Sequence, residues 1–280
     1  MNKIENSVQF NALVKEFRGK CSGVLSNCFL MGAEIDALAA EEKLFAAEFP
    51  GWLLIICDRE GYSNLYYYAD KNADTAYVSQ FMKNIGDREV YLDVVTRNGR
   101  GDNETPDRLI NGGAAEKYKS YQRMQLAVKD IDFDALEINI SDGYTLSDSY
   151  CNCEEIHRLW SVALDEKSTP LPTESELKEL CDDGCLLSVL DSEGKLAGVI
   201  MLGVSSKQVT LQHLAVSPDH RRKGIALCLC HSFFLASKEK ELTLIRLWVD
   251  RANLSAIALY DRLGFTVDGM ICDQLYMKGN

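Results

Sequence analysis

The sequence is poor in basic residues, in proline and in long apolar runs. Among its 280 residues, 30 are lysine or arginine and 42 are aspartate or glutamate, which gives a net charge of −12. A protein that binds duplex nucleic acid needs charge of the opposite sign. Only 5 residues are proline and 46% are hydrophobic, so a collagen-like or disordered chain is excluded. No uncharged apolar run reaches the roughly 18 residues of a membrane-spanning helix. The composition is that of an ordinary globular protein without a membrane span.

The N-terminal residues and the cysteines both point to a cytoplasmic protein. The first ten residues, MNKIENSVQF, have no apolar core after the lysine, so no secretory signal is expected. Ten cysteines in a chain of this length do not form a disulfide scaffold, and we expect reduced thiols. Zinc is suggested by Cys151 with Cys153 and by Cys181 with Cys185, but neither pair has C-x2-C spacing. Buried free thiols are the simpler interpretation, and no metal is expected.

The acidic excess is concentrated in one part of the chain. Residues 131–189 contain 14 acidic and 3 basic side chains, a net charge of −11. A solvated acidic face is the simpler explanation. The alternative is a surface that attracts a cationic substrate such as an amine.

The first half alternates helical and strand patterns. Apolar spacing predicts helices over 7–18, 33–48, 76–85 and 108–122. Alternating or β-branched runs predict strands over 52–58, 65–68, 90–95 and 123–128. The acidic segment 129–143 lacks regular signals, and we interpret it as a linker between domains at 1–130 and 144–280.

The second half predicts a meander of strands followed by a crossover, an α/β (α+β) layer architecture. Thr173 and Glu176 have the spacing of a capping box at the start of a helix that ends near residue 181. Helices are also predicted over 153–164, 222–238 and 255–263. Strands are predicted over 185–190, 196–204, 209–216 and 242–249, with closing strands within 265–277.

The most informative stretch joins a strand end to a helix start. The strand ends at Val216, Pro218 closes it, and residues 221–226, RRKGIA, open the helix. The unpaired N–H groups and the positive dipole end of a first helical turn bind phosphate oxygens, and Gly224 allows close backbone approach. Three basic side chains at 221–223 add positive charge. This pattern predicts a diphosphate site, although alone it also fits a surface turn with a chance basic triplet.

A second pattern follows about thirty residues later. Asn253 precedes a short amphipathic helix that carries Tyr260 and ends at Gly264, a residue suited to a left-handed helix end. Taken singly, Asn253 is a plain helix cap and Tyr260 a core aromatic residue.

Together, the two patterns make residues 145–280 resemble the GNAT superfamily of acyl-CoA N-acyltransferases. The superfamily signature Q/R-x-x-G-x-G/A after a V-x-P strand end matches Val216–Pro218 and Arg221–Ala226. Its second motif matches Asn253 and Ala256–Phe265. The resemblance implies a GNAT fold, a mixed and mostly antiparallel twisted sheet flanked by helices. It also implies transfer of an acetyl or other acyl group from acetyl-CoA to a primary amine by direct attack.

The resemblance also implies roles for particular residues. The pantetheine arm would pair with the backbone of Leu214, Ala215 and Val216, and Asn253 would touch the arm or cap the adjacent helix. Tyr260 would protonate the departing thiolate, a role that suits a phenol with a pKa near 10. The N–H groups that would hold the CoA diphosphate belong to Arg222, Lys223, Gly224, Ile225 and Ala226, with Arg221 adding charge.

The general base is left open by the sequence. No aspartate or glutamate lies between residues 205 and 217, where the strand offers Thr210, Gln212 and His213. Histidine has an ordinary pKa close to neutral pH, which suits a general base, so His213 is a candidate. Strict alternation would place His213 on one strand face with Leu211 and Ala215. The sequence does not determine which face of this strand lines the cleft that would hold the pantetheine arm. The alternative bases are on the first helix of this half: Glu154, Glu155 and His157.

The first half has no second copy of the diphosphate signature. Its nearest glycine-rich piece, residues 97–102, has no V-x-P lead. Its element order nevertheless repeats that of the second half, and residues 116–124 resemble the closing segment of degenerate GNAT domains. We therefore expect a tandem protein with a degenerate N-terminal copy. The alternative is an unrelated α/β domain that frames the acceptor site.

Two functions fit these patterns. The first is an N-acetyltransferase whose acceptor is a small-molecule or peptide amine, with a cationic amine as one option, and with neither nucleic acid nor membrane as a partner. The second is a non-catalytic acyl-CoA-binding or sensor protein. Tyr260 favours the enzyme, and the missing carboxylate base favours the sensor.

Overall fold

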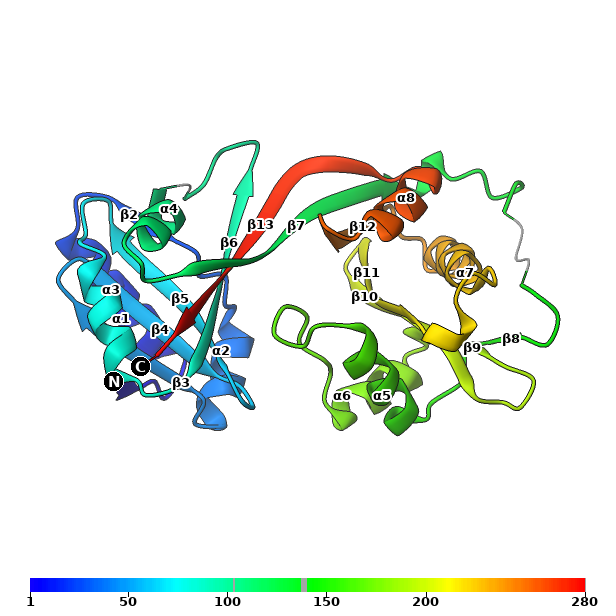
Figure 1. The fold of residues 1–280 in the computed structure, drawn as a ribbon, viewed down its shortest axis with the longest axis horizontal. Helices are drawn as coiled ribbons and strands as arrows, with labels where there is room; N and C mark the ends of the chain where they lie inside the picture. Colours follow the sequence, from blue (N-terminus) through cyan, green and yellow to red (C-terminus); the bar gives the residue numbers. More distant parts are fainter. Residues whose placement is uncertain (103, 137–139, 280) are drawn as a thin grey trace. The chain divides into compact units, whose positions relative to one another are not determined.

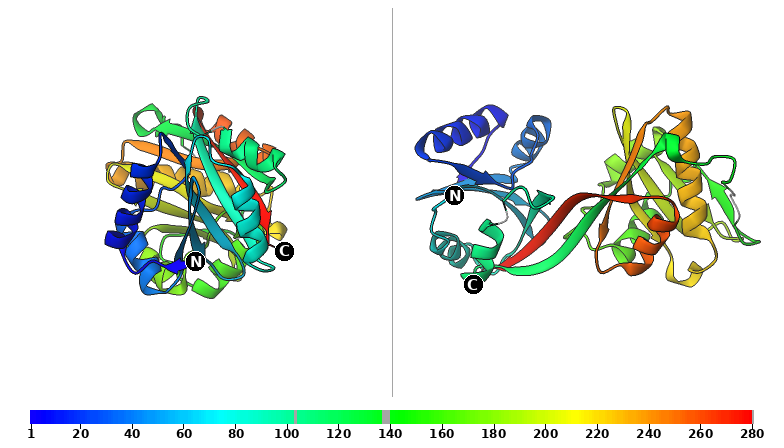
Figure 2. Two further views of the ribbon diagram at one scale, coloured as in Figure 1. Left: turned by 90° about the vertical axis from the view of Figure 1, so that its left-hand side faces the viewer. Right: turned by 90° about the horizontal axis from the view of Figure 1, so that it is seen from above.

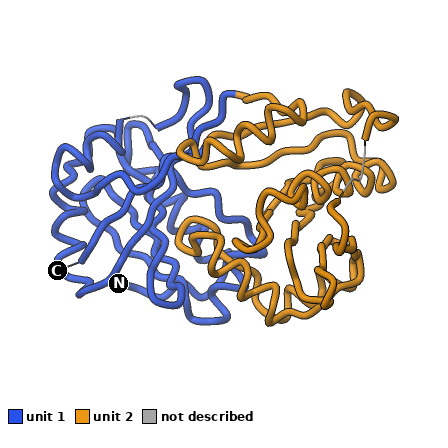
Figure 3. Tube along the Cα trace, turned by 45° about the vertical axis from the view of Figure 1, so that its right-hand side comes forward, with its two compact units in different colours: residues 1–121, 269–280 blue, residues 122–268 orange. Residues whose placement is uncertain are grey.

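The computed structural model describes residues 1–102, 104–136 and 140–279. The chain divides into two compact units (Figure 3): unit 1 contains residues 1–121 and 269–280, and unit 2 contains residues 122–268. Part of the segment expected to be a linker, residues 137–139, lies outside the described residues. The domain limits 1–130 and 144–280 stay a prediction. Within the described ranges, every helix is too short or too polar to cross a lipid bilayer.

Unit 1 is a sheet covered on both faces by helices (Figure 2). Its strands follow the order β1-β3-β4-β5-β6-β13, and β2 pairs with β5. The neighbours are antiparallel except β5 and β6, which are parallel. The strands are β1 (Asn2–Lys3), β2 (Val24–Ser26), β3 (Leu44–Phe49), β4 (Trp52–Asp58), β5 (Ser63–Asp70), β6 (Glu89–Arg97) and β13 (Thr266–Lys278). The helices are α1 (Ser7–Lys20), α2 (Gly32–Ala40), α3 (Ala76–Asn84) and α4 (Glu104–Asn111).

The two cores of unit 1 follow from the alternation of side chains along β4. Trp52 and Leu54 join one buried cluster with α3 and α4, whereas Leu53 and Ile55 join another with α1 and α2. Because successive side chains of a strand point to opposite faces, a run of apolar residues is needed where both faces are covered. The sequence WLLIIC over 52–57 meets that need.

Unit 2 has the strand order β7-β12-β11-β10-β9-β8. Strands β8 to β11 form antiparallel pairs, and β11 with β12 forms a parallel pair. One face packs against α7 and α8 and the other against α5 and α6. The strands (Figure 1) are β7 (Glu116–Ala127), β8 (Thr145–Ser147), β9 (Leu186–Leu190), β10 (Leu196–Ser205), β11 (Gln208–Val216) and β12 (Leu244–Asp250). The helices are η1 (Val128–Asp130), α5 (Cys153–Ala163), α6 (Glu174–Asp182), η2 (Pro218–His220), α7 (Ile225–Glu239) and α8 (Leu254–Arg262).

Two of the predicted helices are wrong. In place of the helix expected over 33–48, α2 ends at Ala40 and β3 begins at Leu44. Residues 44–47 alternate between buried and partly exposed, and residues 44–49 pair with β4. In place of the helix expected over 108–122, α4 ends at Asn111 and a strand begins at Glu116. Gly112 and Gly113 separate the two, and Gly113 has φ +69, a conformation that ends helices.

Other expectations are confirmed with small changes. The Thr173–Glu176 capping box is present, with each side chain bonded to the other residue's backbone N–H. The helix expected over 222–238 begins at Ile225, because Gly224 is its N-cap. The closing segment is the single strand β13. The short strands β1, β2 and β8 were not predicted.

Asp93 gives unit 1 a titratable position in its sheet. It lies on β6 opposite Gln274 of β13. Burial raises the pKa of its carboxyl to about 6, and a hydrogen bond from the Gln274 side chain opposes the shift. At pH 7 the folded chain therefore holds an incompletely solvated carboxylate, which costs stability.

We expect Asp93→Asn to raise the free energy of unfolding at pH 7 by ~1–2 kcal/mol. The gain should shrink as the pH falls from 6 towards 4, because the folded carboxyl then takes up its proton before the unfolded one does. Urea unfolding at pH 7.5 and pH 4.5 measures the difference. Asp87→Asn, at an exposed position of the same unit, is the matched control. A gain independent of pH would contradict the assignment.

Candidate functional site

The parallel strands β11 and β12 separate part of the way along their length. Their pairing runs from Gln208↔Leu244 to Thr210↔Arg246. Beyond Thr210, β11 continues to Val216 without a described strand partner on that side. On its other side it stays paired with β10 as far as Gly198↔Val216. An unpaired strand edge inside a sheet is a place where an extended ligand can add its own hydrogen bonds.

A β-bulge at His213 changes which side chains of β11 face each core. His213 has φ +51, and the register with β10 shifts between Met201↔Gln212 and Val199↔Ala215. Leu211 packs with α7, whereas Ala215 packs with α5 and α6. The expectation that Leu211, His213 and Ala215 share one face is therefore wrong, because a bulge inserts one residue and breaks the alternation.

The His213 ring is held by the loop before α6 and by α5. Its Nε2 lies 3.1 Å from the Pro170 carbonyl oxygen, and its ring centroid is 4.8 Å from that of Trp160. The Trp160 indole N–H donates to the His213 carbonyl oxygen over 2.7 Å. Since a carbonyl only accepts, Nε2 carries the proton and Nδ1 has the free lone pair. This Nδ1 is buried and has no partner within the described residues. Burial lowers the pKa of His213, and the bond to Pro170 opposes this.

We expect the buried imidazole of His213 to make the stability of the chain depend on pH. The unfolded histidine takes up a proton near pH 6.5, whereas the folded one needs a lower pH. Stability should therefore fall as the pH drops below about 6.5, and His213→Asn should make this slope shallower. Chemical unfolding between pH 7.5 and 5 measures it, with His157→Asn at an exposed position of α5 as the control. Equal slopes in the wild type and His213→Asn would contradict the prediction.

The turn between β11 and α7 presents a row of backbone N–H groups. Arg222 has φ +63 and Gly224 has φ +82, and the Gly224 N-cap has no side-chain cap. The first bond of the helix runs from Cys228 N–H to the Gly224 carbonyl oxygen over 2.9 Å. For the N–H groups of 222–227, no acceptor is found in the described part of the chain. Amides arranged around alternating left-handed residues at a helix start form an anion-binding turn.

A chain of side chains supports this turn from the side. Lys223 Nζ donates to the Tyr144 hydroxyl over 2.9 Å, and that hydroxyl lies 2.8 Å from His220 Nδ1. The second nitrogen of His220 is 3.9 Å from an Asp191 carboxylate oxygen. Arg221 Nε lies 3.5 Å from the Val216 carbonyl oxygen. Neither Tyr144 nor Trp160 was predicted as part of the site, because no local motif marks them.

Tyr260 and Asn253 lie on α8, in the same unit. Tyr260 is 6% exposed and packs edge-to-face on Phe265 at 5.7 Å. It belongs to the buried cluster against which Leu214 and Val216 pack. Burial raises the pKa of its phenol, and its hydroxyl has no hydrogen-bond partner among the residues the structure describes. Asn253 Oδ1 caps α8 by accepting from Ala256 N–H over 3.1 Å.

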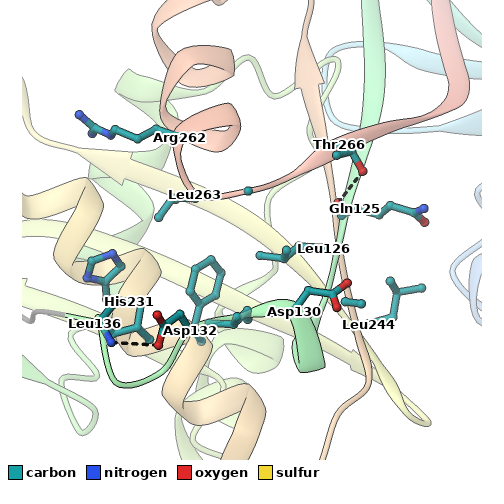
Figure 4. A pocket seen from close by; sticks show the side chains of 15 residues that line it. Gln125, Leu126, Asp130, Asp132, Leu136, His231, Leu244, Arg262, Leu263 and Thr266 are labelled. Carbon is teal, nitrogen blue, oxygen red and sulfur yellow. Dashed lines mark hydrogen bonds between the residues drawn. The ribbon is translucent and has the colours of Figure 1, made fainter.

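A cavity of about 420 Å³ in unit 2 lies elsewhere (Figure 4). It is lined by β7, by the segment after it, by α7 and by the end of α8, and Tyr260 and residues 221–226 are not among its lining residues. The candidate site is therefore defined by the separated strands and the turn, and not by this cavity.

The alternative bases lie on α5 in different settings. Glu155 accepts hydrogen bonds from the Tyr150 hydroxyl and from the Leu196 N–H, so its carboxylate holds α5 to β10. Glu154 pairs with Arg158 at the surface, and His157 is exposed. No contact between these side chains and Tyr260 is found within the described residues.

The separated strands and the turn at 222–227 both lie within the part of the chain that matches a known family. Residues 153–265 match the Acetyltransferase (GNAT) family. A GCN5-related N-acetyltransferase from Sphaerobacter thermophilus has a TM-score of 0.59 and 15% identity, covering 81% of this chain and 76% of that one. A tandem GNAT protein from the clavulanic acid biosynthesis pathway has a TM-score of 0.55 and 14% identity, covering 82% and 79%. The family match thus lies at 153–265, and the likeness to these two solved structures, which is one of fold, extends over most of the chain.

Two curated relatives match part of the chain. The [ribosomal protein bS18]-alanine N-acetyltransferase of Escherichia coli is 33% identical over 76 residues, which is 27% of this chain and 51% of that enzyme. Human N-acetyltransferase 8 is 32% identical over 96 residues, which is 32% of this chain and 42% of that protein. The chain therefore spans about half the length of the curated relatives it matches.

Proposed function

We propose that unit 2 binds an acyl-CoA, with acetyl-CoA as the donor, and transfers the acyl group to a primary amine. The observation that carries this proposal is the opening of β11 from β12 beyond Thr210↔Arg246, next to a turn whose N–H groups at 222–227 lack acceptors in the described part of the chain. An extended arm with amide groups fits the first feature, and a diphosphate fits the second.

The donor would lie along the unpaired edge of β11. The pantetheine amides would pair with the main chain of Leu214, Ala215 and Val216. The diphosphate oxygens would accept from the N–H groups of Arg222 to Ala226, with the Arg221 and Arg222 side chains adding positive charge. Lys223 would contribute its backbone, since its ammonium group is bound to Tyr144. Asn253 would act by fixing the start of α8.

The reaction would proceed by direct attack of the neutral amine on the thioester carbonyl. A backbone N–H on the open edge of β11 would polarise the carbonyl oxygen. As the tetrahedral intermediate collapses, the C–S bond breaks and the Tyr260 phenol protonates the thiolate. The raised pKa of this phenol keeps its proton in place at neutral pH. Burial raises the pKa of the neighbouring Cys230 thiol to about 12, so a thiolate nucleophile is not proposed.

His213 is the proposed base. With Nε2 bonded to Pro170, the lone pair of Nδ1 is the one that can take a proton. The lowered pKa keeps this nitrogen neutral at pH 7. As the base, His213 would give kcat/KM values that rise with pH through its lowered pKa.

The proposed acceptor is a small-molecule or peptide amine. The acidic character of residues 131–189 supports a cationic acceptor, because a field of opposite charge concentrates such a ligand. The Escherichia coli relative is, by its name, an enzyme with an alanine acceptor on a ribosomal protein.

A thioester-cleavage assay over a panel of amines and peptides tests the proposal. We expect acyl-CoA binding together with amine-dependent release of free CoA. Binding of acyl-CoA without turnover of any amine would support the competing function, a non-catalytic acyl-CoA sensor. Absence of binding would contradict both.

A further inference from the structure

Unit 1 contains the same kind of strand opening as unit 2. In the described part of the chain, its parallel strands β5 and β6 pair at Ser63↔Val90 and Asn64↔Tyr91 and nowhere else. Beyond these pairs, β5 continues to Asp70 and β6 to Arg97. The element order β3-β4-β5-α3-β6-α4 repeats the order β9-β10-β11-α7-β12-α8, and each series has one parallel pair. The two openings therefore occupy corresponding places in the two folds.

The opening in unit 1 is filled by the chain itself. Strand β2 pairs antiparallel with β5 at Ser26↔Tyr68, Leu25↔Ala69 and Val24↔Asp70. All three pairs lie beyond the last pair of β5 with β6. The edge of β5 that corresponds to the open edge of β11 thus already has a strand on it.

Asn27, the residue after β2, bridges the two separated strands. Its Nδ2 donates to the Leu65 carbonyl oxygen of β5 over 3.2 Å and to the Asp93 carbonyl oxygen of β6 over 3.0 Å. Its Oδ1 accepts from the Tyr67 N–H over 2.7 Å. The residue is 6% exposed, so these bonds satisfy main-chain groups that water does not reach. The carboxamide here carries the same kinds of donor and acceptor group as an amide of an extended ligand.

The turn that corresponds to the anion-binding turn is also occupied. Between β5 and α3, Asn72 N–H donates to the Asp70 carboxylate over 3.0 Å and Ala76 N–H donates to the Asp74 carboxylate over 2.9 Å. Hydrogen bonds from the Asn72 and Ser22 N–H groups lower the pKa of Asp70. Where unit 2 has three basic residues at 221–223, the turn at 70–76 of unit 1 has one, Lys71, between the carboxylates of Asp70 and Asp74, and carboxylates repel a diphosphate.

We infer that segment 24–27 of unit 1 is an internal substitute for the acyl donor, so the chain has one acyl-CoA site, in unit 2. This inference rests on the proposed function, which assigns acyl-CoA binding to the opening in unit 2. The finding that the opening in unit 1 is filled does not depend on that proposal, because it rests on the hydrogen bonds of β2 and Asn27. Displacing Asn27 would leave three buried main-chain groups without partners.

Calorimetry and hydrogen exchange with the full chain test the stoichiometry. We expect one acetyl-CoA per chain, loss of binding in Gly224→Glu, and new protection on binding at 211–217 and 222–228 but not at 65–76. Two molecules per chain, or protection at 65–76 on binding, would overturn the inference.

A second measurement without any ligand separates this inference from the proposed function. In the free protein, Asn27→Ala should speed exchange of the Tyr67 amide at least tenfold. Asn6→Ala, which removes the cap of α1 in the same unit, should leave that amide unchanged. Unchanged Tyr67 exchange in Asn27→Ala would overturn the inference, even in a protein that binds no acyl-CoA.

A third variant covers the case in which Asn27→Ala does not fold. Asn27→Asp keeps the acceptor for Tyr67 and removes both donors. It should lower the thermal midpoint more than Asn6→Ala does. Equal midpoints for these two variants would count against the bridging role of Asn27.

Discussion

Gly224→Glu is expected to weaken acyl-CoA binding by at least about 100-fold. Gly224 is the N-cap of α7 and has φ +82, a conformation that costs an L-residue about 1–2 kcal/mol. The new carboxylate would also lie beside the proposed diphosphate. Two like charges 4 Å apart repel by about 4 kcal/mol at an effective dielectric constant near 20. Isothermal titration with acetyl-CoA measures the loss.

The matched control for this variant is Gly194→Glu. Gly194 is in the turn between β9 and β10, has φ +78, and its added Cβ would meet open space. It therefore tests the same charge change in the same backbone conformation and the same unit. Equal losses of affinity in the two variants would show that strain or net charge, and not the diphosphate turn, is responsible.

Tyr260→Phe is expected to lower kcat by about 10²–10³-fold while the KM for acetyl-CoA changes little, because general acid catalysis contributes on this scale. Folding should hardly change. The ring keeps its contact with Phe265, and the hydroxyl has no described hydrogen-bond partner to lose. Steady-state kinetics with a slow and a fast acceptor measure the effect.

Tyr66→Phe is the control for loss of a buried phenol. Tyr66 is 7% exposed, lies in unit 1, and has no described partner for its hydroxyl. It should leave kcat unchanged. An unchanged kcat in Tyr260→Phe would remove this residue from the proposed mechanism, while a lowered thermal midpoint with lost activity would point to a structural role.

The parts of the site that sequence reasoning predicted are encoded by contiguous residues. The strand that ends at Val216 and the left-handed Gly224 before the helix follow from a short motif with turn chemistry of its own. The Thr173–Glu176 box and the Asn253 cap each join residues three positions apart. Such signals do not depend on the rest of the fold.

The features that escaped prediction depend on partners distant in sequence. Residues 44–49 become a strand because β4 pairs with them, although their alanines and glutamate also suit a helix. The bulge at His213 arises in the register with β10. The bridge made by Asn27 joins residues about 40 and 66 positions away. Propensity and spacing within one segment contain no information about these contacts.

The last strand has a consequence for how the chain folds as it is synthesised. Met270–Lys278 of β13 pair with β6, and Leu275 and Met277 complete the core that α3 and α4 cover. The N-terminal unit therefore cannot complete its sheet until residues 269–278 have left the ribosome. These residues are synthesised after the whole of unit 2. Until then, the edge of β6 is exposed to wrong pairing, and the unit that is translated first is the one that finishes folding last.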